Sequence, residues 1–316
     1  MTTQQQPLEK KLKDLSIPKY CRRVLCFDTE TTGLLPRHHP GTPFPEDSAY
    51  PYITQLSWIM YNVLTGEIEE VVDEYISIPA NVEISPESTK VSGITREIVD
   101  LKGKPLAPLL IRFYAAYMKC DSIVAHNMNF DKEVVRQEMR RNKQALIELV
   151  KDKSRVNTML GIGTKRFNQV YDIELFCTMT NTTELCNIEW VQKEAAQPVE
   201  ESSIESSSIE SSSTPNICVE NLTEQAKEPP STPLEISEKK PEKKPSNRKK
   251  WPSLTELYTK VFETAPPSDL HNSIIDVLVC LRCFLKVRGA TGIPEEQFQT
   301  LVERYSRPLN ITCHCP

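Results

Sequence analysis

Residues 191–250 interrupt this 316-residue chain with a composition that is unlike that of a packed domain. The segment contains no Gly, no Asp and no aromatic residue, but eleven Ser and seven Pro, and Ile-Glu-Ser-Ser-Ser is repeated between Ile204 and Ser213. A five-residue period matches no solenoid repeat, so the segment is of low complexity. It has too little apolar surface to offset the entropy lost on folding. We therefore expect a disordered insertion, and a fold built from both flanks.

Both flanks show the hydrophobic patterns of a folded α/β domain. Apolar residues alternate or run together in predicted strands and recur at helical spacing in predicted helices. Thr65-Gly66 between two of the strands indicates a hairpin. We expect a mixed sheet that begins with an antiparallel meander and is flanked by helices. The predicted strands are 24–30, 53–62, 67–78, 122–126 and 171–177, and the predicted helices are 106–119, 132–143, 254–262 and 273–287.

These patterns predict a single domain that the insertion divides into two parts. Residues 20–190 form its first part and residues 251–290 its second. An N-terminal extension (1–19) and a C-terminal helix and tail (291–316) lie outside it.

The composition places the chain among ordinary globular proteins, with 39% hydrophobic and 26% charged residues and a net charge of -5. No apolar run approaches the roughly 18–20 residues of a membrane span, and the start lacks a secretory signal. We therefore expect an intracellular protein, cytoplasmic or nuclear, with its ten cysteines reduced. A minor hypothesis is that four of them bind zinc, namely Cys280, Cys283, Cys313 and Cys315.

Two carboxylates share one face of the first predicted strand. Asp28 and Glu30 are separated by about 7 Å of backbone rise, on the face that also carries Val24 and Cys26. Two like charges on a partly buried face repel each other unless a cation lies between them. The alternative is that the strand reaches solvent at its end.

Asp276 lies within the apolar run Ile274–Leu281, where a lone carboxylate costs several kcal/mol unless it is paired or binds a metal. A capping or salt-bridged Asp is the simpler alternative. His271 is five residues earlier, and the two side chains converge only if His271 lies in the preceding loop or the first turn. Asp131 opens a charged helix after a buried strand and is compatible with an ordinary N-terminal helix acid.

Four acids and one histidine together favour two-metal phosphoryl chemistry. Two Mg²⁺ ions about 3.5–4 Å apart need several hard oxygen ligands, and a nearby histidine can take a proton from the attacking water. No competing motif is present, because the sequence lacks GxxxxGK[ST], HExxH and GxSxG.

Three segments, in order, resemble the exonuclease motifs of the DEDDh (DnaQ-like) 3'–5' exonucleases, a family that includes the proofreading subunit of the bacterial replicative polymerase. They are FDTETTG (27–33), HNMNFD (126–131) and HNSIID (271–276). The resemblance covers about residues 20–188 and 250–290, and implies an RNase H-like fold and a metal-dependent 3'–5' exonuclease that releases nucleoside monophosphates.

The resemblance also implies a role for each matching residue. Asp28, Glu30, Asp131 and Asp276 would bind two Mg²⁺ ions, for which Mn²⁺ can substitute, and His271 would be the general base. The partner would be a nucleic acid with a free 3' end, with DNA preferred, and a DNA polymerase or replication protein is a further possible partner. The residues expected to hold the 3'-terminal nucleotide are Thr31, Thr32, Gly33, Leu34 and Asn127.

The sequence departs from the family pattern at three positions. Ser92 stands where the family often has His, which puts one contact with the 3' end in doubt. Met128 and Cys177 replace a small residue and an Asp at positions that look like packing positions. The insertion has no counterpart in compact family members.

Basic residues offer candidate phosphate contacts, for which a solvated surface is an equally good explanation. Seven positive charges and one negative lie between Lys239 and Lys250, next to the segment that leads to His271. A linker end or a nuclear-import signal would explain this stretch as well. The other candidates are Arg136, Arg140, Arg141, Lys165 and Arg166.

Two alternatives to a DNA exonuclease stay open. An exoribonuclease would use the same five residues, because discrimination by the 2'-hydroxyl depends on groove shape. A non-catalytic nucleic-acid-binding module is the more distant alternative, since every acid and the histidine are retained. The sequence does not address oligomeric state.

Overall fold

The computed structural model describes residues 21–38, 41–43, 45–189 and 249–306. The predictions for the N-terminal extension, for disorder in the insertion up to residue 248, and for Cys313 and Cys315 lie outside these residues. Within the described residues, no helix has both the length and the apolar character needed to cross a membrane.

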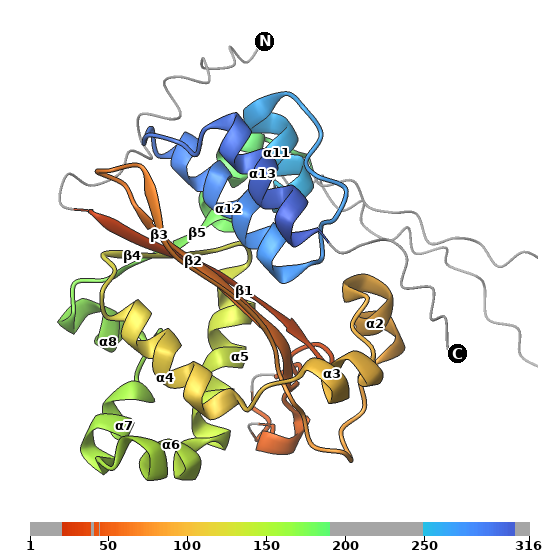
Figure 1. Cartoon of the computed structure of the whole chain (residues 1–316), viewed down its shortest axis with the longest axis vertical. Helices are drawn as coiled ribbons and strands as arrows, with labels where there is room; N and C mark the ends of the chain where they lie inside the picture. The colour runs from red at the N-terminus through yellow and green to blue at the C-terminus, as the bar shows by residue number, and fades with distance from the viewer. Residues whose placement is uncertain (1–20, 39–40, 44, 190–248, 307–316) are drawn as a thin grey trace, which may run out of the picture. The chain divides into compact units, whose positions relative to one another are not determined.

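The folded unit is built on a five-stranded mixed sheet with the strand order β3-β2-β1-β4-β5 (Figure 1). β1 pairs with β2 and β2 with β3 in antiparallel ladders, whereas β1–β4 and β4–β5 are parallel. The antiparallel meander therefore comes first, as the sequence predicts. The strands are β1 (Arg23–Thr31), β2 (Ile53–Asn62), β3 (Glu67–Tyr75), β4 (Ser122–Ala125) and β5 (Glu174–Cys177).

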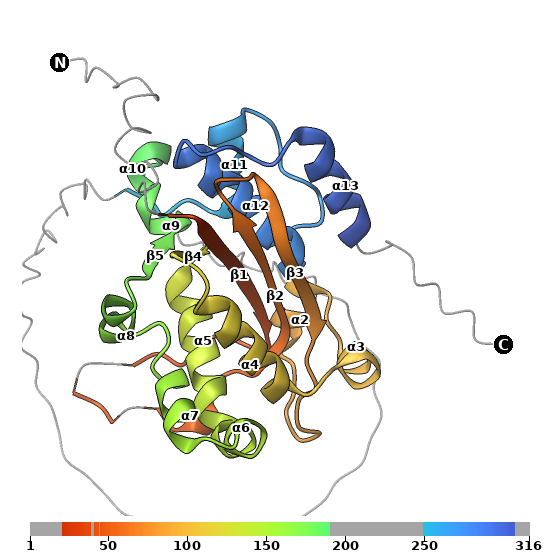
Figure 2. The same ribbon diagram turned by 60° about the vertical axis from the view of Figure 1, so that its left-hand side comes forward.

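Helices cover both faces of the sheet, with α4 and α5 on one side and α11, α12 and α13 on the other (Figures 1 and 2). A short 3-10 turn, Asp47–Ala49, precedes β2. The helices before the insertion are α2 (Pro86–Ser92), α3 (Arg96–Lys102), α4 (Leu106–Tyr117), α5 (Met128–Arg141), α6 (Lys143–Val150), α7 (Lys153–Met159), α8 (Lys165–Val170), α9 (Thr178–Asn181) and α10 (Thr183–Cys186). Those after it are α11 (Leu254–Phe262), α12 (Ser273–Val287) and α13 (Glu295–Tyr305).

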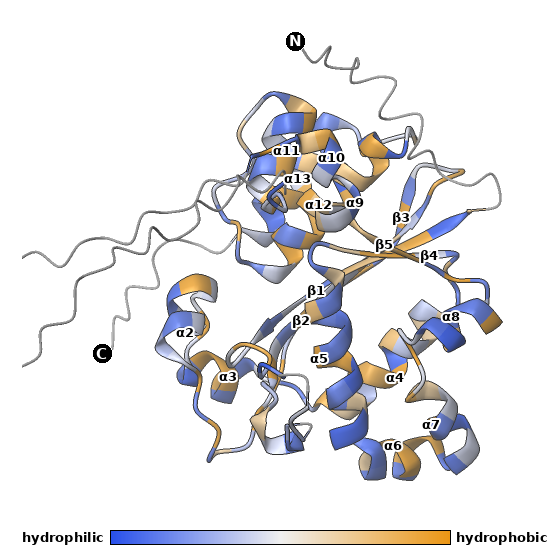
Figure 3. Ribbon diagram, turned by 180° about the vertical axis from the view of Figure 1, so that it is seen from behind, coloured by the Kyte–Doolittle hydropathy of each residue, from blue (hydrophilic) through white to orange (hydrophobic). Residues whose placement is uncertain are grey.

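β1 lies between two hydrophobic cores because its side chains alternate between the two faces of the sheet. Leu25 and Phe27 pack into the core beneath α4 and α5. Val24 and Cys26 pack into the core formed with α12. The apolar colouring of much of α12 in Figure 3 follows this arrangement. A strand buried on both faces is rigid, so polar groups at its end are held in fixed positions.

The observed elements confirm the expected RNase H-like fold, a mixed sheet flanked by helices. The predicted strand 53–62 and helices 254–262 and 273–287 have the predicted bounds. The other predicted elements differ at one or both ends: β1, β4 and α4 by one or two residues, while β5 begins at Glu174 instead of Tyr171. β3 ends at Tyr75, after which Ile76 forms only an isolated bridge with Lys104. α5 begins at Met128 instead of Lys132, and this places Asp131 in its first turn.

The chain leaves and re-enters the folded unit at one place. Glu189 and Lys249 form an isolated antiparallel bridge, and the Lys250 amide donates to the Ile188 carbonyl at 2.9 Å. The two ends that flank residues 190–248 are thus neighbours in the fold. This is the arrangement in which a fold tolerates an insertion.

Candidate active site

β1 supplies two of the predicted acids at its C-terminal end. Asp28 and Glu30 lie on the face that turns towards α12, two and four residues beyond Cys26, which is buried in the core. The Ser273 hydroxyl, at the first residue of α12, donates to the Asp28 carbonyl at 3.0 Å. The strand end and the helix start are therefore fixed to each other where the carboxylates lie.

α12 contributes the third acid in its first turn. Asp276 lies with Asp28 and Glu30 so that one carboxylate oxygen from each is within 4.8 Å of the others. Among the described residues, this is the one group of His, Cys, Asp or Glu with such spacing. Asp276, which is far from Asp28 and Glu30 in the sequence, thus lies beside them in the fold.

His271 lies in the loop that enters α12, which is the placement required for it to approach Asp276. Its backbone amide donates to both carboxylate oxygens of Asp276, at 3.2 and 3.3 Å. Its φ angle is 72°, in the left-handed region that is uncommon for residues with a side chain. The side chain is exposed at the mouth of the site. The carboxylate that could bind metal therefore also holds the loop that carries the histidine.

Asp131 reaches the site from the opposite face of β1. Its Oδ1 accepts from the Thr29 amide at 3.0 Å and from the Thr29 hydroxyl at 2.8 Å. The side chain is buried, at 3% exposure. It is not part of the closely spaced group of three acids, but it lines the same cavity. Thr29 therefore orients the fourth acid, a role that sequence reasoning missed.

A cavity of about 300 Å³ joins these groups into one site. Its walls come from the end of β1, the start of α5, the segment before α11 and the loop before α12. The residues that line it are Phe27, Asp28, Thr29, Glu30, His126, Asn127, Phe130, Asp131, Ser253, Leu254, His271, Asp276 and Cys280. All five predicted catalytic and metal-binding residues are present in this lining.

The electrostatics of the acids are unfavourable without a cation. Loss of water around Asp28 raises the pKa of its carboxyl to about 6. Burial, and then the charge of Asp28, raise the pKa values of Asp131 and Asp276 well above their usual range. No described Lys or Arg lines this cavity. Carboxylates placed this closely are disfavoured as anions, and a bound divalent cation would relieve the repulsion.

The donor set fits a hard divalent cation. Four carboxylates offer oxygen ligands, which Mg²⁺ and Mn²⁺ prefer, and the spacing of three of them is suited to one ion. The partly buried cluster of acids thus supports a divalent-metal site. Its lining contains one thiol, that of Cys280, which is 2% exposed and contacts the Thr178 hydroxyl at 3.5 Å.

His126 lines the cavity but is held as a neutral side chain. Its Nδ1 lies 2.9 Å from the Thr178 hydroxyl, and burial lowers the pKa of its ring to about 4. A ring that stays neutral at physiological pH supplies hydrogen bonds and no charge. The HNMNFD motif could have pointed to His126, because it immediately precedes Asn127.

Four of the five residues predicted to hold the 3'-terminal nucleotide lie at or just after the end of β1, and Asn127 lies immediately before α5. Thr31 closes the turn with a bond from its hydroxyl to the Gly33 carbonyl at 2.7 Å. Leu34 is 84% exposed, so its side chain is available to a ligand. Asn127 lines the cavity with a left-handed φ of 64°. Thr32 instead makes backbone and side-chain bonds to Tyr52, with its amide 2.9 Å from the Tyr52 carbonyl.

The positions that depart from the family pattern are engaged in the fold. The Ser92 hydroxyl donates to the Ser88 carbonyl at 2.8 Å and accepts from the Ile94 amide, and its side chain is buried. Met128 is buried in the core beneath α5. Cys177 is half-buried at the end of β5 and packs against the same core.

The zinc hypothesis gains no support from the described residues. Cys280 and Cys283 are both buried in the apolar core around α12. Neither belongs to a group of potential ligands among the described residues.

Most of the predicted phosphate-binding cations are engaged with neighbouring side chains. Arg136 and Arg140 pair with Glu133, and Arg141 pairs with the buried Glu138. Lys165 and Arg166 are exposed at the start of α8. Of the basic stretch before Trp251, the two described residues make ion pairs, Lys249 with Glu184 and Lys250 with Glu256.

Comparison with known proteins gives a match over the first part of the fold. Residues 25–167 match the family described as exonuclease (RNase_T). This range includes β1 with Asp28 and Glu30, and α5 with Asp131, while His271 and Asp276 lie beyond it. The matched part of the chain is thus similar to exonuclease domains, and this similarity supports the expectation of a nuclease.

Solved structures of exonuclease I are also among the proteins to which this chain is similar. One, reported to suggest how processivity is achieved, has 17% identity and a TM-score of 0.46, and covers 90% of this chain and 44% of that chain. The E. coli enzyme in complex with a dA16 oligonucleotide has 16% identity and a TM-score of 0.38, and the match covers 55% of this chain and 32% of that enzyme. The zinc-bound form of an E. coli ExoI–ssDNA complex has 19% identity and a TM-score of 0.36, and the match covers 54% of this chain and 32% of that one.

This chain therefore spans less than half the length of these structures. No curated protein matches the sequence.

Proposed function

We propose that this chain is a metal-dependent 3'–5' exonuclease that removes nucleoside monophosphates from the 3' end of a nucleic acid strand. The single observation that carries the proposal is the convergence of four acids and His271 on one cavity of about 300 Å³. The match of residues 25–167 to an exonuclease family supports the reaction class. The order of the three sequence motifs supports the 3'–5' polarity.

The acids would hold the metal. Asp28, Glu30 and Asp276 suit one ion because their oxygens are closely spaced. Asp131, which lines the same cavity, would contribute with Asp28 to a second ligand set. When bound, Mg²⁺ would neutralise phosphate charge and increase the acidity of a coordinated water. The acids would otherwise repel the phosphodiester, because the lining has no described Lys or Arg.

His271 would act as the general base. Its side chain is exposed at the cavity mouth, and the bonds from its amide to Asp276 hold its backbone next to the acids. From this position the imidazole would take the proton of the attacking water. The exposed Leu34 and the turn at Thr31–Gly33 would contact the terminal nucleotide, and Asn127 would help to place the strand.

DNA is the substrate that we propose, because the motifs resemble those of a DNA-proofreading subunit. The test uses single-stranded DNA, duplex DNA and single-stranded RNA, each labelled at the 5' end and incubated with Mg²⁺ or with EDTA. We expect a Mg²⁺-dependent ladder of shortened products that is strongest with DNA. Faster shortening of RNA would replace DNA by RNA in the proposal. Binding of any strand without Mg²⁺-dependent shortening would contradict an exonuclease.

A further inference from the structure

We propose that Arg141 and Glu138 are positioning residues for the substrate: they hold residues 50–53 against Thr32 and so fix the turn that receives the 3'-terminal nucleotide. Neither residue lines the acidic cavity. This inference rests on the proposed function, because it assigns a role to the turn of Thr31–Leu34.

Thr32 is held by two neighbouring segments. Its amide donates to the Tyr52 carbonyl at 2.9 Å, and its hydroxyl accepts from the Tyr52 amide at 3.0 Å. Its carbonyl accepts from the Ser85 amide at 2.9 Å. The β1–β2 register shifts between Glu30 and Thr31, and Thr31 with Ile53 is the last pair of the ladder, so the bonds of Thr32 lie beyond the regular pairing. The position of Thr32 therefore depends on the position of Tyr52.

Arg141, in the last turn of α5, holds the segment that contains Tyr52. Its guanidinium donates to three backbone carbonyls, those of Asp47 at 3.1 Å, Tyr50 at 3.0 Å and Pro51 at 3.3 Å. Its guanidinium carbon also lies 3.7 Å from the centre of the Tyr52 ring. Three carbonyls and one aromatic face between residues 47 and 52 require the planar fork of Arg, which Lys does not have.

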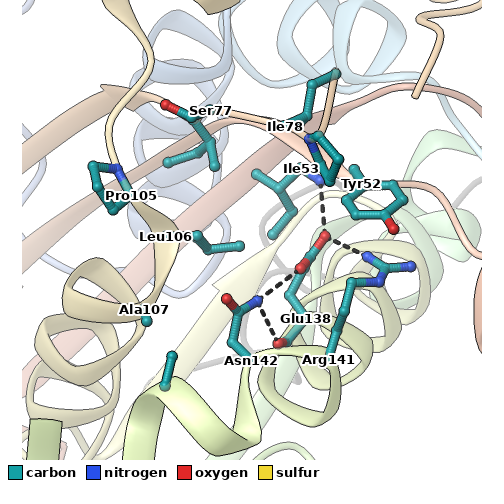
Figure 4. A pocket seen from close by; sticks show the side chains of 13 residues that line it. Tyr52, Ile53, Ser77, Ile78, Pro105, Leu106, Ala107, Glu138, Arg141 and Asn142 are labelled. Atoms are coloured by element: carbon teal, nitrogen blue, oxygen red, sulfur yellow. Dashed lines mark hydrogen bonds and ion pairs between the residues drawn. The ribbon is translucent and has the colours of Figure 1, made fainter. Parts of the chain in front are cut away.

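Glu138 completes the attachment one turn earlier on α5. Its Oε1 accepts from Arg141 at 2.6 Å and from the Ile53 amide at 3.3 Å, and Asn142 donates to its Oε2 at 3.1 Å (Figure 4). The side chain is 2% exposed. A buried carboxylate of this kind is costly without its partner, so Glu138 and Arg141 act as a unit.

Packing holds only part of this segment, because Ile53 is fully buried in the core whereas Tyr52 is half-buried. A cavity of about 460 Å³ lies beside both residues, lined on its other sides mainly by apolar residues such as Ile78, Leu106 and Ala107 (Figure 4). Close packing normally fixes a segment through many small contacts, and a cavity removes them on one side. The hydrogen bonds from Arg141 and Glu138 add to the constraint on that side.

α5 thereby connects the two halves of the proposed site. Asp131 lies in its first turn, bonded to Thr29, and Arg141 lies ten residues later in its last turn. Ten residues correspond to roughly 15 Å along a helix. One rigid element thus sets the distance between a proposed metal ligand and the turn that would receive the nucleotide.

The test is the steady-state kinetics of Arg141→Lys on 5'-labelled single-stranded DNA with Mg²⁺. We expect KM to rise about tenfold while kcat stays within about twofold, because the turn is displaced and the acids are not. Glu138→Gln keeps an oxygen for the Ile53 amide but loses the charge, and we expect a smaller rise in KM. This second variant decides the question if Arg141→Lys does not fold.

Arg288→Ala is the matched control. Like Arg141, Arg288 is paired with a glutamate, Glu174, and stacked on aromatic rings. It is buried, but it lies after α12 and far along the chain from the turn. We expect its removal to lower the melting temperature without changing KM.

Three results would overturn the inference. An unchanged KM in Arg141→Lys or, if that variant does not fold, in Glu138→Gln would show that the pair serves only stability. A rise in KM of the same size in Arg288→Ala would show that KM responds to stability in general. Absence of Mg²⁺-dependent cleavage by the wild-type chain would overturn the proposed function itself, and this inference with it.

Discussion

At the scale of a single residue, the position of Asp28 suits metal binding but disfavours its ionised carboxylate when no metal is bound. Its carboxyl is placed with two other acids in a position that suits a cation, and the loss of water raises its pKa to about 6. Because the folded-state pKa lies above the ordinary 3.8, the folded state binds protons more tightly than the unfolded state. Without metal, the ionised Asp28 therefore destabilises the fold above about pH 6, and the effect declines as the pH falls towards 4.

Asp28→Asn should therefore stabilise the metal-free protein while abolishing hydrolysis. We expect unfolding in urea at pH 8 with EDTA to require on the order of 2 kcal/mol more than for the wild type, because the repulsive charge is removed. The difference should shrink as the pH is lowered to 5. Addition of Mg²⁺ should raise the melting temperature of the wild type but not of the variant. A variant that is less stable than the wild type in EDTA, or that retains turnover, would contradict this account.

Substitution of His271 tests its assignment as the general base. His271→Ala should lower kcat by roughly 10²–10⁴-fold, the usual contribution of a positioned general base. The dependence of kcat on pH should lose its acidic limb, because the group that must be deprotonated has gone. Since the side chain is exposed, the melting temperature should change little. A pH profile identical to that of the wild type would remove His271 from this role.

Individual residues also show where sequence reasoning ends. The acids on β1 could be predicted because alternation alone places Asp28 and Glu30 on one face. The approach of Asp131 from the other face, and its bonds to Thr29, depend on how α5 packs across the sheet. The engagement of Arg141 with Glu138 and three carbonyls likewise depends on tertiary contacts, so its charge alone suggested a phosphate ligand.

At the scale of elements, long periodic segments are predictable and short ones are not. β2, α11 and α12 have the bounds that hydrophobic periodicity predicts. The helices α6, α7 and α8 have eight, seven and six residues, too few for a clear period, and were not predicted. α5 begins before its charged pattern does, because Met128 is buried and Asn127 turns the chain with a positive φ.

The N-terminus of α11 is capped by two reciprocal hydrogen bonds between Ser253 and Glu256. The Ser253 hydroxyl accepts from the Glu256 amide, and the Glu256 carboxylate accepts from the Ser253 amide at 2.8 Å. Ser253→Ala removes one of these bonds, and we expect a loss of about 1 kcal/mol in the free energy of unfolding, measured in urea. Ser253→Asp, which can still cap the helix, should recover most of it. A loss below about 0.3 kcal/mol would show that the cap contributes little here.

At the scale of the whole molecule, the composition of residues 191–250 predicted that the fold is formed by two separated segments. The pairing of Glu189 with Lys249 agrees with that organisation, because it brings the two segments together at one point. The acidic net charge of -5 was a poor guide to the proposed substrate. Acids that bind metal and acids that repel phosphate contribute equally to such a sum.

Replacing residues 190–248 with a short Gly–Ser linker should leave the folded unit intact. Residues bonded across an antiparallel pair are about 5 Å apart, so a loop of two to five residues spans them. We expect the melting temperature and kcat to remain close to those of the full chain. KM measured at rising salt would show whether the deleted segment, with its basic end, contributes to substrate binding. Loss of cooperative unfolding would contradict the independence of the folded unit.

The most direct test of the central claim is the position at which label is first released from single-stranded DNA. One strand carries its label at the 3'-terminal nucleotide and an otherwise identical strand carries it at the 5' end. The account predicts that, with Mg²⁺, the 3' label is released at once as a mononucleotide while the 5' label remains on a shortening strand, and that EDTA or Asp28→Asn stops both. Immediate release of the 5' label, internal cuts, or cleavage that persists in EDTA would contradict it.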